Sequence, residues 1–163
     1  MRWLVFAAMT ILSACQGPVP DVLAGRTQGP SFSVSSVTPL QSNLARIYFY
    51  RDYEPYESLS QPWIYLNGSR VGASVPGGIF YRDVPPGPYE ITVDSTGIYP
   101  NQFKSLTLQP GQTLYVKIES LRNWYDGAHF THDTFFVALI GPRLAEAEVP
   151  QMRLVSGDPV AFP

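Results

Sequence analysis

Two histidines three residues apart, His129 and His132 in the stretch NWYDGAHFTHDT, are the side chains in this sequence best suited to metal chemistry. Imidazole and carboxylate groups together bind zinc and other transition metals, and Asp126 and Asp133 flank the pair. The same stretch is also typical of a polar turn between strands, because Asp-Gly favours turns. Since it offers neither a cysteine ligand nor a helix to present the pair, we favour the turn and predict no metal and no cofactor.

Three carboxylates, Asp52, Glu54 and Glu57, cluster in the stretch RDYEPYESLSQP and are the residues best placed for general acid–base catalysis. Acidic, proline-rich segments are usually solvated loops, so we expect no catalysis there. The sequence also lacks a Gly-x-Ser-x-Gly nucleophile motif and a glycine-rich loop that leads into a helix. We therefore predict no catalytic residue and a protein that is not an enzyme.

Cys15 is the one cysteine of the 163 residues, and it ends a short apolar N-terminus. The basic Arg2 precedes an apolar run from Trp3 to Leu12, which is too short to span a bilayer core that takes about 20 residues. A basic start, a short apolar run and small residues at its end are typical of a secretory signal. We therefore predict a signal peptide over residues 1–14.

The tetrapeptide LSAC, Leu12 to Cys15, resembles the bacterial lipobox. The resemblance implies that the Cys15 thiol carries a lipid, that signal peptidase cuts between Ala14 and Cys15, and that palmitate is attached. Two or three acyl chains, at ~0.8 kcal/mol per buried methylene, would hold the protein firmly on a membrane. Gln16 differs from the aspartate that retains lipoproteins in the inner membrane of enteric bacteria, which implies the outer membrane, facing the periplasm.

The composition favours one β-rich domain after the signal peptide. The chain has 16 prolines, 13 glycines and many aromatic residues (ten Tyr, nine Phe and three Trp), which favour short strands joined by turns. A net charge of −2 gives no electrostatic case for binding nucleic acid, which needs clustered cations, so we predict no nucleic-acid partner. We divide the rest of the chain into the lipidated cysteine and a flexible linker over 15–43, a β-sandwich over 44–155 and a tail over 156–163.

Apolar and polar residues alternate along several segments of the predicted sandwich, as in ARIYFYR from Ala45. Asn67-Gly68 predicts a tight hairpin, because both turn positions need positive φ. The continuous apolar run TFFVALIG, 134–141, predicts a central strand covered on both faces. The segment RLAEAEVPQMRLV fits a short helix or a strand. About seven short strands predict an all-β fold, an antiparallel β-sandwich of the immunoglobulin-like or carboxypeptidase-regulatory-like type.

Four segments of the predicted sandwich carry a family resemblance: ARIYFYR, IYLNGSRVG, GIFYRDVPPGPYEITV and LTLQPGQTLYVKI. They are similar to the tyrosine-rich first strand, the G-x-x-V-G hairpin, the Pro-Gly-x-Tyr entry and the Gly-Gln-x-x-Tyr strand of the bacterial lipoprotein family known as domain of unknown function 2846. These are mostly structural residues. The resemblance therefore implies the fold and the lipid anchor rather than an activity.

Aromatic residues in or beside loops could stack on sugars or anchor a protein partner, or could simply cap the ends of the sandwich. They are Tyr53, Tyr56, Trp63, Trp124 and Tyr125. Our leading hypothesis is a lipid-anchored, non-catalytic sandwich that binds or scaffolds an envelope protein or glycan. The alternatives are a small envelope metal-dependent hydrolase that uses His129 and His132, and a structural spacer without a ligand.

Overall fold

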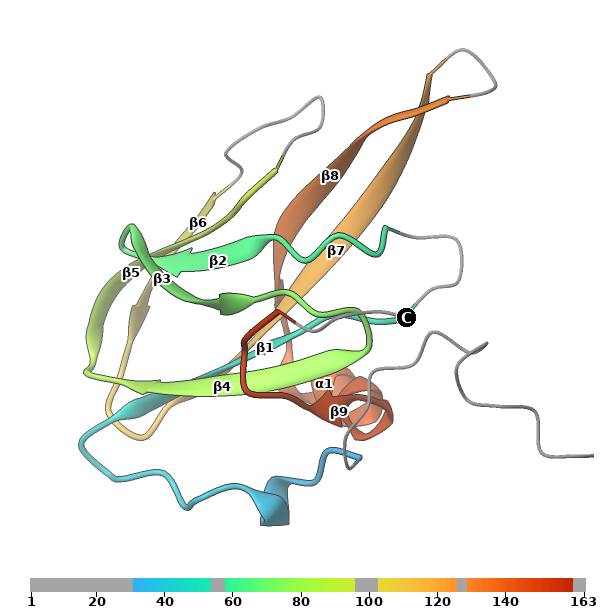
Figure 1. Ribbon diagram of the computed structural model, residues 1–163. Helices are drawn as coiled ribbons and strands as arrows, with labels where there is room; N and C mark the ends of the chain where they lie inside the picture. Colours follow the sequence, from blue (N-terminus) through green and yellow to red (C-terminus); the bar gives the residue numbers. More distant parts are fainter. Residues whose placement is uncertain (1–30, 54–57, 96–102, 126–128, 160–163) are drawn as a thin grey trace, which may run out of the picture.

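Two β-sheets pack face to face in the computed structural model (Figure 1). The structure describes residues 31–53, 58–95, 103–125 and 129–159. Within these ranges, 121–125 and 129–133 are described by their backbone alone. The first sheet has the order β8-β7-β1-β4-β9 and the second the order β3-β2-β5-β6. The strands are β1 (Ala45–Tyr50), β2 (Trp63–Leu66), β3 (Ser69–Ala73), β4 (Gly78–Val84), β5 (Gly87–Val93), β6 (Phe103–Leu108), β7 (Thr113–Tyr125), β8 (His129–Ile140) and β9 (Arg153–Leu154). The predicted all-β sandwich is confirmed.

Two strand pairs of the first sheet are parallel, namely β1 with β7 and β4 with β9. The remaining pairs between the named strands are antiparallel, as expected. The described residues form nine strands where the sequence predicted about seven. Parallel neighbours need a long crossover connection, which an alternation pattern within each strand cannot reveal.

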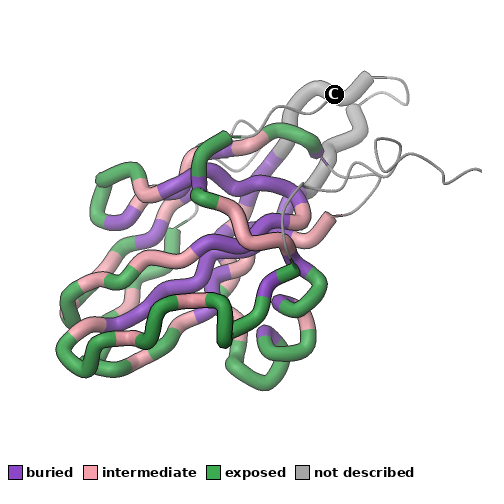
Figure 2. The backbone as a smooth tube through the Cα atoms, turned by 60° about the horizontal axis from the view of Figure 1, so that its bottom comes forward, coloured by how far each residue is buried: buried purple, intermediate pink, exposed green. Residues whose placement is uncertain are grey.

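The inner core lies between the two sheets and is built by alternate residues of each strand. In β1 the predicted alternation holds: Ile47 and Phe49 point into this core, while Tyr48 and Tyr50 point to the outer face of the five-stranded sheet. All six residues of β1 are buried, because the strand lies between β7 and β4 and is covered on both faces. Figure 2 shows this buried band through the middle of the fold, with the exposed residues at the turns.

A third layer covers the outer face of the five-stranded sheet. It consists of α1 (Pro142–Glu148), the 3-10 turn η3 (Val149–Gln151) and the segment before β1, which contains the 3-10 turn η2 (Val34–Ser36). The second core cluster beneath it comprises Phe32, Tyr48, Tyr50, Ile79, Tyr115, Ala145, Val149 and Met152. The alternatives left open for RLAEAEVPQMRLV thus resolve into a short helix that begins with proline at its first turn, a 3-10 turn and the two-residue strand β9.

Residues 31–43, which the sequence assigns to the flexible linker, lie on this outer layer. The Phe32 side chain is 4% exposed, and its ring meets the Tyr48 ring edge-on with the ring centres 5.5 Å apart. The Phe32 N–H donates to the Met152 carbonyl at 2.9 Å, and Ser31 forms an isolated bridge with Arg153. The described part of the predicted linker is therefore packed against the domain.

A charged pair also anchors the outer face. The Arg46 guanidinium donates two hydrogen bonds to the Asp83 carboxylate, from Nε at 2.6 Å and from Nη2 at 2.7 Å. It lies 4.3 Å from the centre of the Tyr81 ring, and the Tyr48 and Tyr115 rings stack beside it with their centres 5.2 Å apart. Bidentate pairs of this kind add geometric specificity to the attraction, so they fix the register of β1 against β4.

The run TFFVALIG is an edge strand, and the prediction of a central strand is wrong. Phe135 and Val137 point into the inner core, and Ile140 packs on the outer cluster. A continuous apolar run indicates that both faces of a strand are covered, and both faces of β8 are covered in part. Pairing at the two edges involves the backbone, so the run does not indicate it. Among the described residues, β8 is paired with another strand only along the edge that faces β7.

The predicted tail begins inside the packed fold. Gly157 is buried, and its carbonyl accepts a hydrogen bond from the Ala73 N–H at 2.7 Å. The Arg82 guanidinium donates to the Ser156 carbonyl at 3.3 Å. Residues 156 and 157 therefore bridge β3 and β4. In the described part of the chain, none of the helices is long and apolar enough to cross a membrane.

Candidate binding surface

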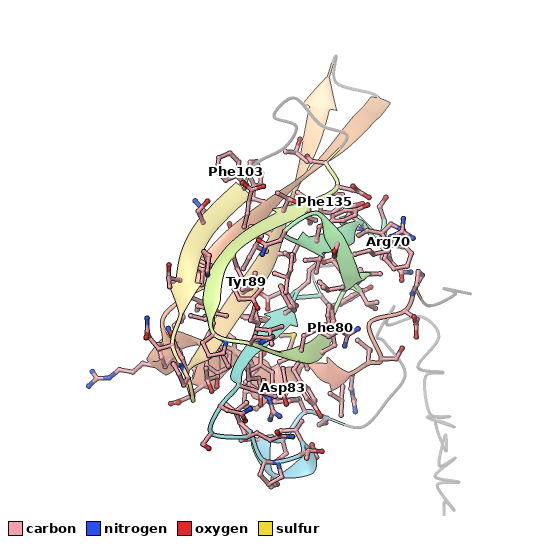
Figure 3. The ribbon with its side chains drawn as sticks, turned by 90° about the vertical axis from the view of Figure 1, so that its left-hand side faces the viewer. Arg70, Phe80, Asp83, Tyr89, Phe103 and Phe135 are labelled. Carbon is pink, nitrogen blue, oxygen red and sulfur yellow. The ribbon has the colours of Figure 1, made fainter. Side chains whose placement is uncertain are left out.

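The two ends of the sandwich differ in the length of their connections. At one end, short turns join β2 to β3, β4 to β5 and β6 to β7. At the other end lie the short connection 74–77 and the longer connections 51–62 and 94–102, and the β7–β8 hairpin projects beyond the rest of the fold (Figure 1). Figure 3 shows Phe103 and Phe135 toward this second end and Asp83 toward the first. We call the second end the loop end, and it is the candidate binding surface, because binding residues concentrate on loops that a rigid scaffold positions.

The hairpin projects because β7 is longer than its neighbour β1. Tyr50, the last residue of β1, lies opposite Lys117, and β7 continues to Tyr125. At about 3.3 Å per residue, this continuation carries β7 roughly 25 Å beyond the end of β1. The register of β7 with β8 shifts between Asn123 and Trp124, and such bulges increase the local twist of a ribbon. The hairpin is therefore a twisted arm that reaches away from the sandwich.

Arg51, directly after β1, ties the loop end to the sandwich. Its side chain is 1% exposed. Nη1 donates to the Ser60 carbonyl at 2.8 Å, and Nη2 donates to the Ser58 carbonyl and, at 3.2 Å, to Ser120 Oγ. The guanidinium carbon lies 5.0 Å from the centre of the Phe135 ring. One buried cation thus joins the first loop to β7 and β8.

The predicted partner-binding aromatics belong to this loop end by their position in the chain. Tyr53 and Trp63 are half-buried. The Arg70 guanidinium lies 4.1 Å from the centre of the Trp63 ring, so it covers one face of that indole. Two further candidates, Trp124 and Tyr125, lie on β7 within the projecting arm. The fifth, Tyr56, lies outside the described residues.

The two candidate metal ligands lie on a strand and not in a turn. His129 begins β8, and His132 and Asp133 follow within its ladder with β7. Among the side chains that the structure describes, no group of three or more His, Cys, Asp or Glu could hold a metal ion. The remaining candidate acids near these sites lie outside the described residues: Asp126, Glu54 and Glu57.

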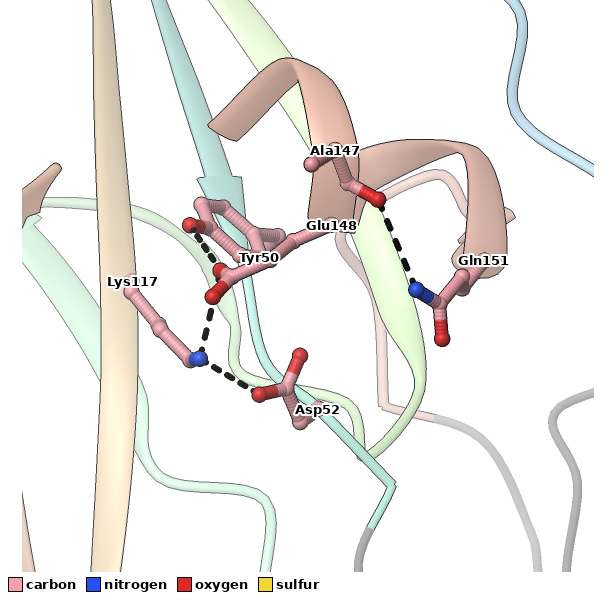
Figure 4. Close-up of polar contacts among 6 residues, drawn as sticks. All are labelled: Tyr50, Asp52, Lys117, Ala147, Glu148 and Gln151. Carbon is pink, nitrogen blue, oxygen red and sulfur yellow. Dashed lines mark hydrogen bonds and ion pairs between the residues drawn. The ribbon is translucent and has the colours of Figure 1, made fainter. Parts of the chain in front are cut away.

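Asp52, the described member of the acidic stretch, belongs to a polar cluster where α1 meets β1 and β7 (Figure 4). Lys117 Nζ lies 2.5 Å from Asp52 Oδ2 and 3.2 Å from Glu148 Oε2. The Tyr50 hydroxyl donates to the same Glu148 oxygen at 2.7 Å. The ammonium therefore links two carboxylates that lie far apart in the sequence.

The pKa shifts in this cluster fix its protonation states. Burial, helped by the hydrogen bond to Glu148, raises the pKa of Tyr50 far above its ordinary value of 10.0. Burial alone would lower the pKa of Lys117, but its contacts with Asp52 and Glu148 raise the pKa above 10.5. Near neutral pH Tyr50 is a neutral phenol and Lys117 an ammonium, which suits neither to act as a base or nucleophile. The cluster holds α1 on the sheet.

A shallow groove of about 490 Å³ runs along the unpaired edge of β8. Its lining residues are Lys104, Glu119, Phe136, Val137, Ala138 and Leu139. Leu139 is 42% exposed, whereas Phe135 and Val137 of the same strand are buried in the inner core. This edge is a second surface that could contact another molecule.

Sequence reasoning missed Arg51 and the Tyr50–Glu148 contact. A signal for Arg51 was present, because it continues the alternation of Ile47 and Phe49 and therefore faces inward. A cation at an inward position needs polar partners, which predicts carbonyls or hydroxyls around it. The contact of Tyr50 with Glu148 spans 98 residues, and nothing in the sequence pairs the two.

Comparison with known proteins gives one family. Residues 41–128 match the model of a family described as protein of unknown function (DUF2846). The match covers more than half of the chain and runs from just before β1 into the connection after β7. No curated protein compared with the chain matches it.

Proposed function

The chain belongs to the DUF2846 family, and from this premise we propose that it is a lipid-anchored bacterial envelope protein whose sandwich binds or scaffolds another envelope component without catalysis. One observation carries the binding role: the long connections and the projecting β7–β8 arm gather at one end, opposite the tight turns. The buried Arg51 stiffens the base of this loop end. A preordered base reduces the entropy that a surface loses when it binds.

The anchor is supported by the N-terminal sequence. Cys15 follows a basic residue, a short apolar run and two small residues, and the sequence holds no second cysteine for it to pair with. The residues from Gln16 to Pro30 precede the first described residue. Fully extended, they reach at most about 50 Å. This length allows a lipidated Cys15 to sit in the membrane while the sandwich stays in the aqueous phase.

The non-catalytic role is supported by the charged groups of the described fold. Lys117 and Tyr50 are held in the protonation states that disfavour proton abstraction and nucleophilic attack. Arg46 and Asp83 are paired with each other on the outer layer. These groups are therefore used to join elements of the fold.

Cross-linking in intact cells tests the binding role. We expect a lysine- or carboxyl-reactive cross-linker to capture a discrete envelope partner with the wild-type chain. The double variant Trp124→Ala, Tyr125→Ala should lose that partner, because it strips the arm of its aromatic anchors. Leu144→Ala is the matched control, since Leu144 is an exposed apolar residue on α1, 54% exposed and away from the arm. Retention of the partner by the arm variant, or its loss from the control, would contradict a role of the loop end.

Membrane fractionation with labelled palmitate tests the anchor. The wild-type chain should take up label and fractionate with the outer membrane. Cys15→Ser should take up none and should remain an unprocessed precursor, because the thiol is the acceptor of the lipid. Gln16→Asp should keep the label but shift to the inner membrane. An unlabelled wild-type chain would refute the anchor, and an unmoved Gln16→Asp chain would refute the proposed sorting.

Elemental analysis tests the alternative of a metal-dependent hydrolase. We expect the purified wild-type chain and the double variant His129→Ala, His132→Ala to carry equal, substoichiometric zinc. Stoichiometric zinc that disappears in the double variant would replace the binding role by a metal site on β8.

A further inference from the structure

We propose that a second copy of this chain adds to the open edge of β8, so that two five-stranded sheets join antiparallel across a two-fold axis at Ala138. The inference does not depend on the lipid anchor or on a partner at the loop end. It rests on the edge itself, on the direction of its backbone groups and on the match between the edge and its own two-fold copy.

The edge of β8 is less protected than the other sheet edges. Strand β9 has two residues, β3 is capped where the Ala73 N–H donates to the Gly157 carbonyl, and β6 carries the charged Lys104. The β8 segment 134–140, TFFVALI, carries neither a charge nor a proline. Soluble proteins normally blunt an edge with charge, proline, short length or a cover, so an edge without them is suited to pairing with another strand.

The backbone of β8 presents free hydrogen-bonding groups at this edge. The Phe135 N–H points away from β7, because it donates to Ser95 Oγ at 3.2 Å. Backbone groups in a strand alternate in direction with a period of two, so those of Val137 and Leu139 point to the same side. Within the described part of the chain, the N–H and C=O groups of these two residues make no hydrogen bond across the open edge.

An antiparallel copy centred on Ala138 matches this pattern. Val137 then lies opposite Leu139 of the second copy, and Leu139 opposite its Val137, so both outward-pointing residues form hydrogen-bonded pairs. The two Ala138 residues face each other at the narrow, non-hydrogen-bonded position, where Cα atoms approach to about 4.5 Å and a small side chain fits. Phe136 meets Ile140 of the second copy, an aromatic–aliphatic pair that stabilises antiparallel strands.

The surface around the edge fits the same occupant. Leu139 is 42% exposed and lines the groove of about 490 Å³ beside the edge. Lys104 and Glu119 line the groove too, so the surface that a second copy meets carries charges of both signs and not a single repelling sign. Pairing with a second copy would cover this apolar surface and satisfy the free backbone groups in one step.

A proline at position 139 tests strand pairing directly. The full-length protein is purified in detergent, and its mass is measured by sedimentation and light scattering over a range of concentrations. We expect a dimer for the wild-type chain and, for Leu139→Pro, an apparent dissociation constant raised at least about tenfold, because proline has no N–H to donate to Val137 of the second copy. The N–H lost is not used in the ladder with β7, so melting curves should show that the variant folds.

Leu139→Thr is the matched control, because it removes the apolar side chain but keeps the N–H. It should dimerise more tightly than Leu139→Pro. A wild-type chain that stays monomeric, a Leu139→Pro chain that dimerises like wild type, or a Leu139→Thr chain as impaired as Leu139→Pro would each overturn the proposal. A monomeric wild-type chain would indicate that the β8 edge binds an extended peptide of another protein. Equal loss of dimerisation in Leu139→Thr and Leu139→Pro would indicate that the contact is apolar and does not use the N–H of residue 139.

Disulfide cross-linking tests the position of the axis. Ala138→Cys should give a covalent dimer under mild oxidation in cells, because non-hydrogen-bonded pairs hold Cα atoms at a distance that a disulfide spans. Glu119→Cys is the control, since it is exposed on the neighbouring strand β7 and one strand removed from the axis. The parent chain, which carries only Cys15, supplies the baseline. Equal cross-linking by both variants, or none from Ala138→Cys, would contradict an axis at Ala138.

Discussion

Replacing Phe32 by alanine tests whether the segment before β1 is part of the folded domain. The Phe32 side chain is 4% exposed and packs edge-on against Tyr48 with the ring centres 5.5 Å apart. Truncation of a buried phenylalanine to alanine usually costs ~3–5 kcal/mol. We take the lower end, about 3 kcal/mol, because the outer layer is thin and can relax, and because the backbone hydrogen bond to Met152 survives the change. At roughly 3 °C per kcal/mol for a domain of this size, Tm should fall by about 10 °C.

Urea and thermal unfolding of the full chain, followed by near-ultraviolet circular dichroism, measure this loss. Val34→Ala is the control, since Val34 lies two residues further on and is 59% exposed, and it should change stability by less than about 0.5 kcal/mol. If Phe32→Ala cost no more than Val34→Ala, the segment would be a free tether, as its composition suggests. The packing described for the outer layer would then be wrong.

Three further changes probe other parts of the fold. Arg51→Met should destabilise the domain by about 3 kcal/mol, because it leaves buried acceptors unsatisfied, and hydrogen exchange should show faster exchange of the amides in the loop after β1. The raised pKa values of Tyr50 and Lys117 mean that the folded state keeps protons that the unfolded chain releases, so stability should hold up to about pH 10 and fall at higher pH. Tyr50→Phe should flatten that fall in urea unfolding across a pH series, and an unchanged slope would refute the assignment. Asn67→Ala should cost ~1–2 kcal/mol in thermal unfolding, because Asn67 has φ of 48° and its side chain accepts a backbone N–H, whereas the exposed Ser69→Ala should cost almost nothing.

The local structure could be predicted where it depends on neighbouring residues. The Asn67-Gly68 turn was predicted from its need for positive φ, and both residues have it, at 48° and 75°. The alternation of Ile47 and Phe49 against Tyr48 and Tyr50 also holds, because the pleat alone sends successive side chains to opposite faces. Local rules were sufficient for these features.

Features that depend on distant contacts could not be predicted in the same way. The parallel pairing of β1 with β7 is decided by the path of the chain between them, which leaves no mark on either strand. Residues 31–43 have the composition of a linker, yet Phe32 and Val37 pack on the outer cluster, and Ser31 and Phe32 pair with the backbone after α1. Glu148 and Tyr50 meet only because α1 folds back over β1. At the loop end, binding by the aromatics stays a prediction, and Arg51, which joins the first loop to β7 and β8, was not predicted.

The pairing of the two ends of the described chain constrains when the protein can fold. Arg153 contacts Ser31 across 122 residues, and β9 adds to β4 near the very end of the chain. During synthesis β1 cannot pair with β7, nor β4 with β9, until those later strands have been made, so the five-stranded sheet cannot be complete before Leu154 is in the chain. Topologies of such high contact order also fold slowly. Until those strands are made, β1 and β4 each keep one unpaired edge, and such edges can pair with other chains.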